Sequence, residues 1–239
     1  MRSVSDQSLR DLGGRWSVLN RQKLDHVELD RLLERLERTR GAEQRRVLLR
    51  TYRLVFPHAF AEESVLWPVL RAVLPDGHEL TLQVEQEHQG VNELVIRLDE
   101  LDDGDPERDE VLQRLIAVLR EDVRDEEDVL LPRLQEKLSP ARLRALGVAW
   151  EAVRRTAPTR PHPLVARRPP GNVAAALPLT VTDRLRDLLE SAVLRSSSPV
   201  EPILTESSSL LARAAHAIEH LPIMRRGEDP STARGHTAA

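Results

Sequence analysis

The sequence contains no cysteine, and this absence removes several classes of protein at once. Without a thiol there is no disulfide, no thiolate zinc site, no iron–sulfur cluster and no cysteine nucleophile. Any metal must therefore be bound by histidine, aspartate and glutamate. Aromatic residues are also scarce, at 3% of the chain, while leucine, arginine, glutamate and alanine abound. This composition favours helix over sheet and argues against an all-β sandwich or barrel.

Long apolar runs and a strong charge of one sign are absent as well. No run approaches the roughly 18 apolar residues of a membrane span, and the N-terminus lacks the apolar stretch of a signal peptide. The formal net charge is −4, whereas a dedicated nucleic-acid binder is usually basic. We therefore expect a cytoplasmic protein with neither a nucleic-acid nor a membrane partner, of unknown oligomeric state.

Apolar residues at 3-and-4 spacing predict four long amphipathic helices. Their expected ranges are 16–39, 42–73, 76–101 and 105–137. Asp76 and Glu79 form an expected capping box, and Asp105–Pro106 pairs an N-cap residue with a proline at the first helical position. Short connections between long helices favour an all-α, antiparallel up-down four-helix bundle.

The composition changes after the fourth helix. Ser139–Pro140 predicts a fifth helix, and the six prolines between residues 158 and 178 predict an irregular segment, because proline and the residue before it resist helix. The extension is expected to cover a face of the bundle or, alternatively, to dock a partner or form oligomers. The expected parts are an N-terminal segment (1–15), the bundle (16–138), a fifth helix (139–155), a proline- and arginine-rich linker (156–182), a C-terminal helical arm (183–220, with flexible residues 196–199) and a flexible tail (221–239).

Each of the four long helices carries ionisable residues on the stripe that should face the core. A buried charge is costly unless it is paired or bound to a cation. Pairs at i and i+4 lie on one face of a helix and can reach one ion together. The three histidines and three carboxylates are His26 on the first helix, His58 and Glu62 on the second, His88 on the third, and Asp122 and Glu126 on the fourth.

An internal repeat relates the two halves of the predicted bundle. His58–Leu70 aligns without gaps on Asp122–Leu134 at an offset of 64, and His26 and His88 lie 62 residues apart. Each half is thus a helical hairpin, with one histidine on its first helix and a pair of ionisable residues on its second. Two such hairpins, packed antiparallel, would bring all six side chains together in the interior. Carboxylate and imidazole ligands without sulfur suit iron or manganese and, less specifically, zinc. The alternative is a buried network of His–carboxylate pairs without metal, which needs nearly complete hydrogen bonding.

Short motifs surround these residues. They are His58-x3-Glu62-Glu63, Leu66-Trp67-Pro68 and Glu126-Glu127-x4-Pro132, with His26 before them and His88 between them. This ordered set resembles the haemerythrin-like HHE cation-binding domain family over roughly residues 16–137. The resemblance implies a four-helix bundle with a non-haem, usually dinuclear, iron site. The metal ligands that it implies are His26, His58, Glu62, His88, Glu126 and the residue at position 122.

The resemblance implies a protein that binds, senses or detoxifies O2, NO or peroxide at a site holding two iron ions, with manganese or zinc as less favoured metals. The alternatives are an iron-responsive regulatory module, in which metal occupancy exposes or hides the C-terminal arm, and a metal-free structural bundle with a degenerate site. No phosphate loop, dinucleotide fingerprint or nucleophile–base arrangement is present, so nothing supports a hydrolase or kinase. Whether the protein turns over a substrate is left open.

Position 122 departs from the family pattern, which has histidine where this chain has Asp122. Aspartate is shorter and anionic, so it can still be a ligand, directly or through water. The added negative charge stabilises the higher metal oxidation state. This argues against reversible oxygen transport and favours oxidative chemistry, peroxide handling or a single occupied metal position.

Two further pairs of ionisable residues stand near or outside the motifs. Glu63 and Glu127 each follow a candidate ligand, so we expect them either to orient a ligand histidine or to lie on a solvated face. His216 and His220 have the spacing of metal ligands. No third ligand accompanies them, so we expect surface histidines.

Overall fold

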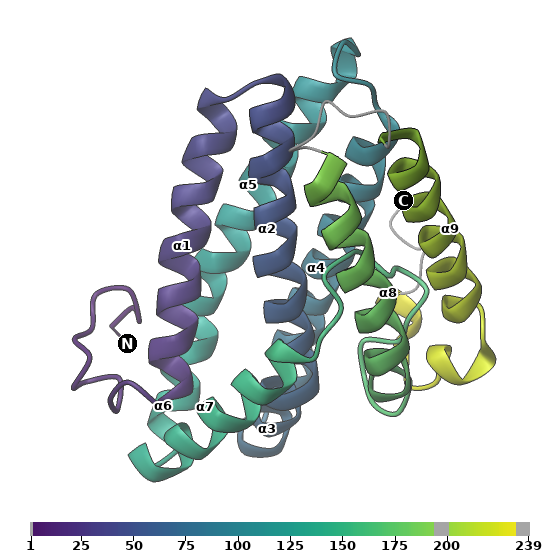
Figure 1. Ribbon diagram of the computed structural model, residues 1–239. Coiled ribbons are helices and arrows are strands. Elements are labelled where there is room, and N and C mark those ends of the chain that lie inside the picture. Colours follow the sequence, from purple (N-terminus) through teal and green to yellow (C-terminus); the bar gives the residue numbers. More distant parts are fainter. Residues whose placement is uncertain (1, 194–200, 233–239) are drawn as a thin grey trace.

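The computed structural model describes residues 2–193 and 201–232, which fold into helices and connecting segments without a strand (Figure 1). The long helices are α1 (Val18–Arg38), α2 (Gly41–Ala61), α4 (Gly77–Glu100), α5 (Pro106–Asp125), α7 (Pro140–Arg155), α8 (Gly171–Val193) and α9 (Glu201–Glu219). The short helices are α3 (Trp67–Val73) and α6 (Leu131–Lys137), with 3₁₀ turns at Pro222–Arg225 and Pro230–Thr232. Residues 196–199, which the sequence predicts to be flexible, lie outside the described part of the chain.

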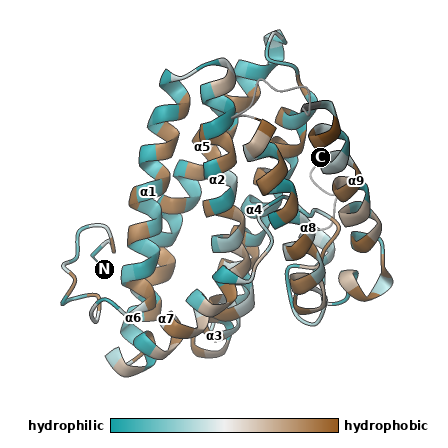
Figure 2. Cartoon of the chain, in the orientation of Figure 1, coloured by the Kyte–Doolittle hydropathy of each residue, from teal (hydrophilic) through white to brown (hydrophobic). Residues whose placement is uncertain are grey.

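Helices α1, α2, α4 and α5 run side by side as an up-down bundle (Figure 1). α1 packs on α2 and α5, and α4 packs on α5, while α7 crosses α1 and α2 near one end. Hydropathy alternates around the long helices, so that their apolar faces meet inside (Figure 2). The all-α, four-helix prediction is confirmed.

The buried apolar side chains form two clusters along the bundle. One contains Leu29, Phe56, Val91 and Leu119 among others. The second contains, from the same helices and their continuations, Leu19, Leu66, Val84 and Leu130. On each helix the candidate ligands fall in the sequence between a member of one cluster and a member of the other. The ionisable residues therefore form a polar layer between two hydrocarbon layers, which exclude water from it.

Two π-helical turns continue the second and fourth long helices past the polar layer. They span Glu62–Leu66 and Glu126–Leu130. The Trp67 N–H donates to the Glu62 carbonyl and the Leu131 N–H to the Glu126 carbonyl, five residues back instead of four. Each turn begins at a candidate ligand and precedes a proline, whose ring would crowd the carbonyl four residues back in a regular helix. The sequence predicts helices over 42–73 and 105–137, and the structure has a π turn within each of these ranges.

Two of the three expected N-cap hydrogen bonds are present. The Asp105 carboxylate accepts a hydrogen bond from the Glu107 N–H at 2.9 Å, and the Ser139 hydroxyl accepts one from the Arg142 N–H at 3.4 Å. The expected capping box at Asp76 is wrong, because this side chain makes no cap hydrogen bond. Its carboxylate instead accepts from both terminal nitrogens of Arg133, at 2.7 and 2.8 Å.

The C-terminal extension is more helical than its prolines predict. The chain is irregular only as far as Pro170, and α8 begins at Gly171 rather than at Asp183, with Pro178 inside it. α8 packs along α9 and buries Ala175 and Leu179. We attribute the longer helix to this burial, which offsets the hydrogen bond that proline removes.

The described part of the expected tail also packs on the rest of the molecule. Met224 is buried, its carbonyl accepts from the Ala166 N–H at 2.8 Å, and Glu228 accepts from the Arg167 N–H at 2.7 Å. Residues 221–232 are therefore folded, which corrects the expected flexible tail over that range. Within the described residues, no helix has both the length and the apolar character needed to cross a membrane.

His162 ties the extension together and predicts a pH-dependent stability. Its Nε2 lies 3.0 Å from Asp183 and its Nδ1 2.9 Å from Glu219. Burial lowers the pKa of His162, but the two carboxylates outweigh burial and raise it to about 9. Because the folded pKa is raised above 6.5, the protonated ring stabilises the fold fully below pH 6.5. This contribution, on the order of 3 kcal/mol, is lost as the pH rises through about 9.

We therefore expect the difference in free energy of unfolding between wild type and His162→Gln to be large at pH 6 and to narrow toward pH 9.5. Urea titrations of both proteins at these two pH values measure it. A difference that stays constant with pH would show that the histidine contributes by packing alone.

Candidate metal centre

Six ionisable side chains from four helices converge in the polar layer of the bundle. His26 Nε2 lies 3.3 Å from His58 Nε2 and 3.2 Å from Glu126 Oε2. His58 Nε2 lies 3.2 Å from Glu62 Oε1. The structure thus brings the candidates from α1, α2 and the two π turns onto one centre.

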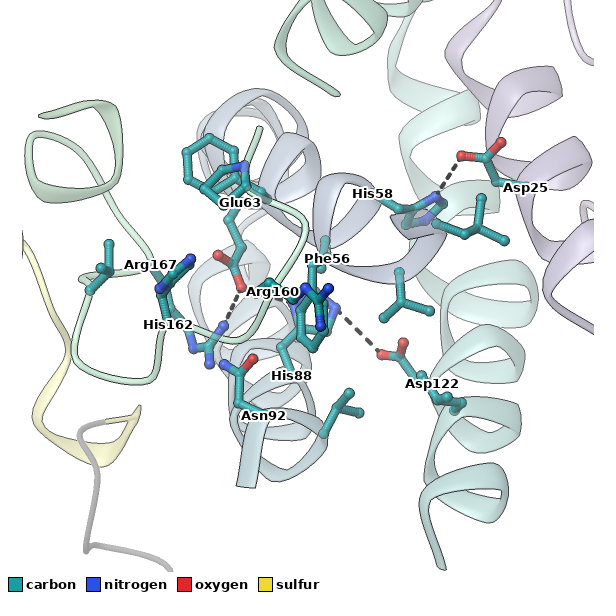
Figure 3. A pocket seen from close by; sticks show the side chains of 18 of the residues that line it. Asp25, Phe56, His58, Glu63, His88, Asn92, Asp122, Arg160, His162 and Arg167 are labelled. Carbon is teal, nitrogen blue, oxygen red and sulfur yellow. Dashed lines mark hydrogen bonds and ion pairs between the residues drawn. The ribbon is translucent and has the colours of Figure 1, made fainter. Parts of the chain in front are cut away.

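The candidates from α4 and α5 are His88 and Asp122, which a dashed line joins in Figure 3. His88 Nε2 lies 3.8 Å from Glu62 Oε2 and 3.7 Å from Asp122 Oδ1. All six side chains are buried, with Glu62 and Glu126 at 0% and 1% exposure. Every residue singled out for the metal site therefore lies in one buried cluster.

The cluster divides into two overlapping groups of potential cation ligands. His26, His58 and Glu126 offer one atom each within 4.8 Å of one another, and so do Glu62, His88 and Glu126. Glu126 belongs to both groups, so its carboxylate could be a ligand in either of them. Asp122 belongs to neither group and lies beside the second.

A carboxylate holds the outer nitrogen of each histidine. His26 Nδ1 lies 3.0 Å from Glu127, and His88 Nδ1 lies 2.9 Å from Glu63. His58 Nδ1 lies 3.2 Å from Asp25. Such a carboxylate fixes the ring and its tautomer, so that the Nε2 atoms face the centre.

Of these three carboxylates, the sequence pointed to two. Glu63 and Glu127 take the orienting role rather than the solvated one. Asp25 was missed, because its helical position beside His26 carries no periodic signal. Its partner His58 lies 33 residues away, on another helix.

Several carboxylate oxygen atoms in the cluster are buried without a hydrogen-bond donor. Within the described part of the chain, both Glu62 oxygens, Asp122 Oδ1 and Glu126 Oε1 are buried and accept no hydrogen bond. His58 is close enough to pair with Glu62, but the pair lacks hydrogen-bond geometry. Since a buried unpaired carboxylate oxygen is costly, the donor set fits a bound cation.

Comparison with known proteins reaches the same segment. Residues 17–134 match the family model described as Hemerythrin HHE cation binding domain. This segment is a haemerythrin-like HHE domain. An uncharacterized hemerythrin-like protein of Schizosaccharomyces pombe is 27% identical over 134 residues, which cover 56% of this chain and 66% of that relative. No solved structure matches the chain.

Without a cation, protons supply positive charge to the haemerythrin-like centre. Burial lowers the pKa of His26, but Glu126 and Glu127 outweigh burial and raise it to about 9. Burial also lowers the pKa of His88, and here Asp122 and Glu63 raise it to about 9. Burial and the nearby Glu126 charge raise the pKa of Asp122 well above its usual value. In the absence of a metal these shifts favour the protonated forms of His26, His88 and Asp122, while the oxygens named above accept no hydrogen bond.

A cavity of about 80 Å³ adjoins the haemerythrin-like centre. From the bundle it is lined by Phe56, Val91 and Leu119 beside the site histidines. From the extension, Val165 and Ala166 close it on the other side. The extension thus covers the bundle at the metal centre, in line with the covering role expected for it.

The second histidine pair lies outside the haemerythrin-like domain. His216 and His220 are exposed at the end of α9, with their Nε2 atoms 3.1 Å apart. The groups of three or more potential ligands found among the described residues do not include them. They are surface histidines, as expected.

Proposed function

We propose that this protein is a non-haem iron protein whose dinuclear centre binds, senses or detoxifies O2, NO or peroxide. The observation that carries the proposal is the pair of buried ligand groups sharing Glu126, with carboxylate oxygens that accept no hydrogen bond. The proposed ligands are His26, His58 and Glu126 at one position, and Glu62, His88 and Glu126, with Asp122 beside them, at the other.

The donor chemistry supports iron ahead of other metals. Carboxylate oxygen and imidazole nitrogen suit iron and manganese, and zinc less specifically. Bound iron supplies an electron and a coordination position for a small ligand. The match to a cation-binding family supports a metal ion and does not choose among the three.

The chain's own residues determine what reaches the centre and how it is charged. The cavity of about 80 Å³ beside the centre has room for a diatomic molecule or peroxide. Asp122 places an anionic group where the family has a neutral imidazole, which favours the higher oxidation state of a bound metal. We therefore propose oxidative or peroxide chemistry, or sensing, rather than reversible oxygen carriage. An iron-responsive regulatory role would use the same centre, with the extension as its reporter.

The proposal is tested by producing the full chain in iron-rich medium and measuring metal content and the visible spectrum. We expect about two iron ions per chain and a visible ligand-to-metal band that changes when peroxide or NO is added. A colourless, metal-free preparation that takes up no ferrous iron in vitro would contradict the proposal. If the protein took up manganese or zinc in preference to iron, the proposed ligands would stand and the proposed metal would be wrong.

A further inference from the structure

Three segments outside the HHE domain contact the residues whose carboxylates hold the site histidines, two of them at the carboxylate itself. Near the N-terminus, the Val4 N–H donates to the Glu127 carbonyl at 2.9 Å. From α7, Arg154 Nη1 lies 3.7 Å from Asp25. From the segment between α7 and α8, Arg167 Nη1 lies 2.7 Å from Glu63 (Figure 3). Arginines from beyond the family segment therefore contact the carboxylates behind two of the three site histidines, His58 and His88.

We propose that Arg167 is a positioning residue for the metal centre, which acts through Glu63 on His88 and controls how firmly one of the two metal ions is held. This inference rests on the proposed metal site. It assigns to the extension a function at the centre beyond covering it.

The contacts of Arg167 leave Glu63 little freedom. The guanidinium is buried, with Nη1 on Glu63 Oε1 and Nη2 on Gln89 Oε1, both at 2.7 Å. The same Glu63 oxygen contacts His88 Nδ1 at 2.9 Å. The two terminal nitrogens bind two different side chains, and the planar guanidinium, in a two-nitrogen grip, fixes Glu63 and Gln89 relative to each other. Glu63 is thus held between the guanidinium and the imidazole, and His88 Nε2 is directed at Glu62 and Asp122.

The two positions differ in how firmly they are supported. Arg154 stands farther from its carboxylate, at 3.7 Å, and its side chain is 26% exposed. The Arg167 side chain is 9% exposed and in direct contact. We therefore expect removal of Arg167 to affect the position that contains His88 and to leave the position of His26 and His58 nearly unchanged.

Arg168 provides a matched control. It is the next residue along the chain and also ties the extension to α4, with Nη2 2.6 Å from Glu85. The other partner of Glu85 is Arg71. Removing Arg168 therefore loosens the same extension without touching a carboxylate that holds a site histidine.

The experiment loads wild type, Arg167→Gln, Arg167→Lys and Arg168→Gln with ferrous iron and follows its extraction by a chelator. Changes around metal ligands typically weaken binding 10- to 100-fold. We expect about half of the iron in Arg167→Gln to leave roughly 10- to 100-fold faster than in wild type, with the other half unchanged. Arg167→Lys keeps the charge but not the two-nitrogen grip, so its acceleration should be intermediate. Melting temperatures of the metal-free proteins report any general loosening.

Equal acceleration in Arg167→Gln and Arg168→Gln would overturn the inference, because loosening of the extension alone would then explain it. Unchanged extraction in Arg167→Gln would overturn it too. If Arg167→Gln does not fold, Arg167→Lys decides, since wild-type extraction in that variant contradicts a positioning role. Failure of wild type to hold any iron would contradict the proposed function itself, whereas the other outcomes are read on a loaded wild type.

Discussion

Replacing Glu126 by glutamine is expected to abolish metal binding at both positions. Glu126 is the one residue common to both ligand groups, and glutamine keeps its shape while removing its charge. Loss of a shared anionic ligand should exceed the 10- to 100-fold effect typical of outer residues, so we expect at least about 100-fold weaker binding. Elemental analysis after iron loading and dialysis measures the metal that remains.

The control for this variant is Glu121→Gln, which removes the same charge from an exposed position on the same helix. It should retain the wild-type metal content. If Glu126→Gln also retained that content, the carboxylate would not be a ligand and the dinuclear arrangement would be wrong. If only half of the metal were lost, Glu126 would serve one position instead of two.

Removing the metal is expected to lower the melting temperature by roughly 8–16 °C. A ligand that binds only the folded state at about 1,000 times its dissociation constant stabilises it by about 4 kcal/mol. For a chain of this size, each kcal/mol shifts the melting temperature by about 2–4 °C. The estimate is for one occupied position. Thermal melts of the iron-loaded protein before and after chelation, with calorimetric detection, measure the shift.

A metal-free structural bundle makes the opposite prediction. Its melting temperature would be indifferent to both iron and chelator, because protonated histidines would already balance the carboxylates. The Glu126→Gln variant is the control for any direct effect of the chelator. Its melting temperature should be the same with and without chelator. A shift of equal size in that variant would locate the stabilising metal outside the proposed centre.

Much of the bundle and its polar layer could be predicted from residue order alone. Apolar spacing places the four helices, and an ionisable residue on a core-facing stripe is conspicuous because burying its charge is costly. The repeat that relates His58 to Asp122 pairs the two halves. These signals are local or periodic, so they can be recognised in the sequence without knowledge of the tertiary structure.

Other features depend on contacts between segments far apart in the sequence. Asp25 faces His58 and Arg167 faces Glu63 across 33 and 104 residues. Neither pair has a periodic relation that a single sequence could reveal. The sequence predicts Asp76 as a helix cap, but its carboxylate pairs with Arg133, which lies 57 residues away.

The sequence by itself determined the helical class, the order of the four long helices, and which side chains had to share the interior, since hydrophobic burial and the cost of buried charge act on residue type and spacing. Only the tertiary structure decided that π turns begin at Glu62 and Glu126 and that α8 continues through Pro178. It also decided that Arg154 and Arg167, from outside the HHE domain, lie 3.7 and 2.7 Å from the carboxylates behind His58 and His88. Those outcomes depend on which surfaces pack together. A helix adopts a π turn or accommodates a proline where the surrounding packing offsets the lost backbone hydrogen bond.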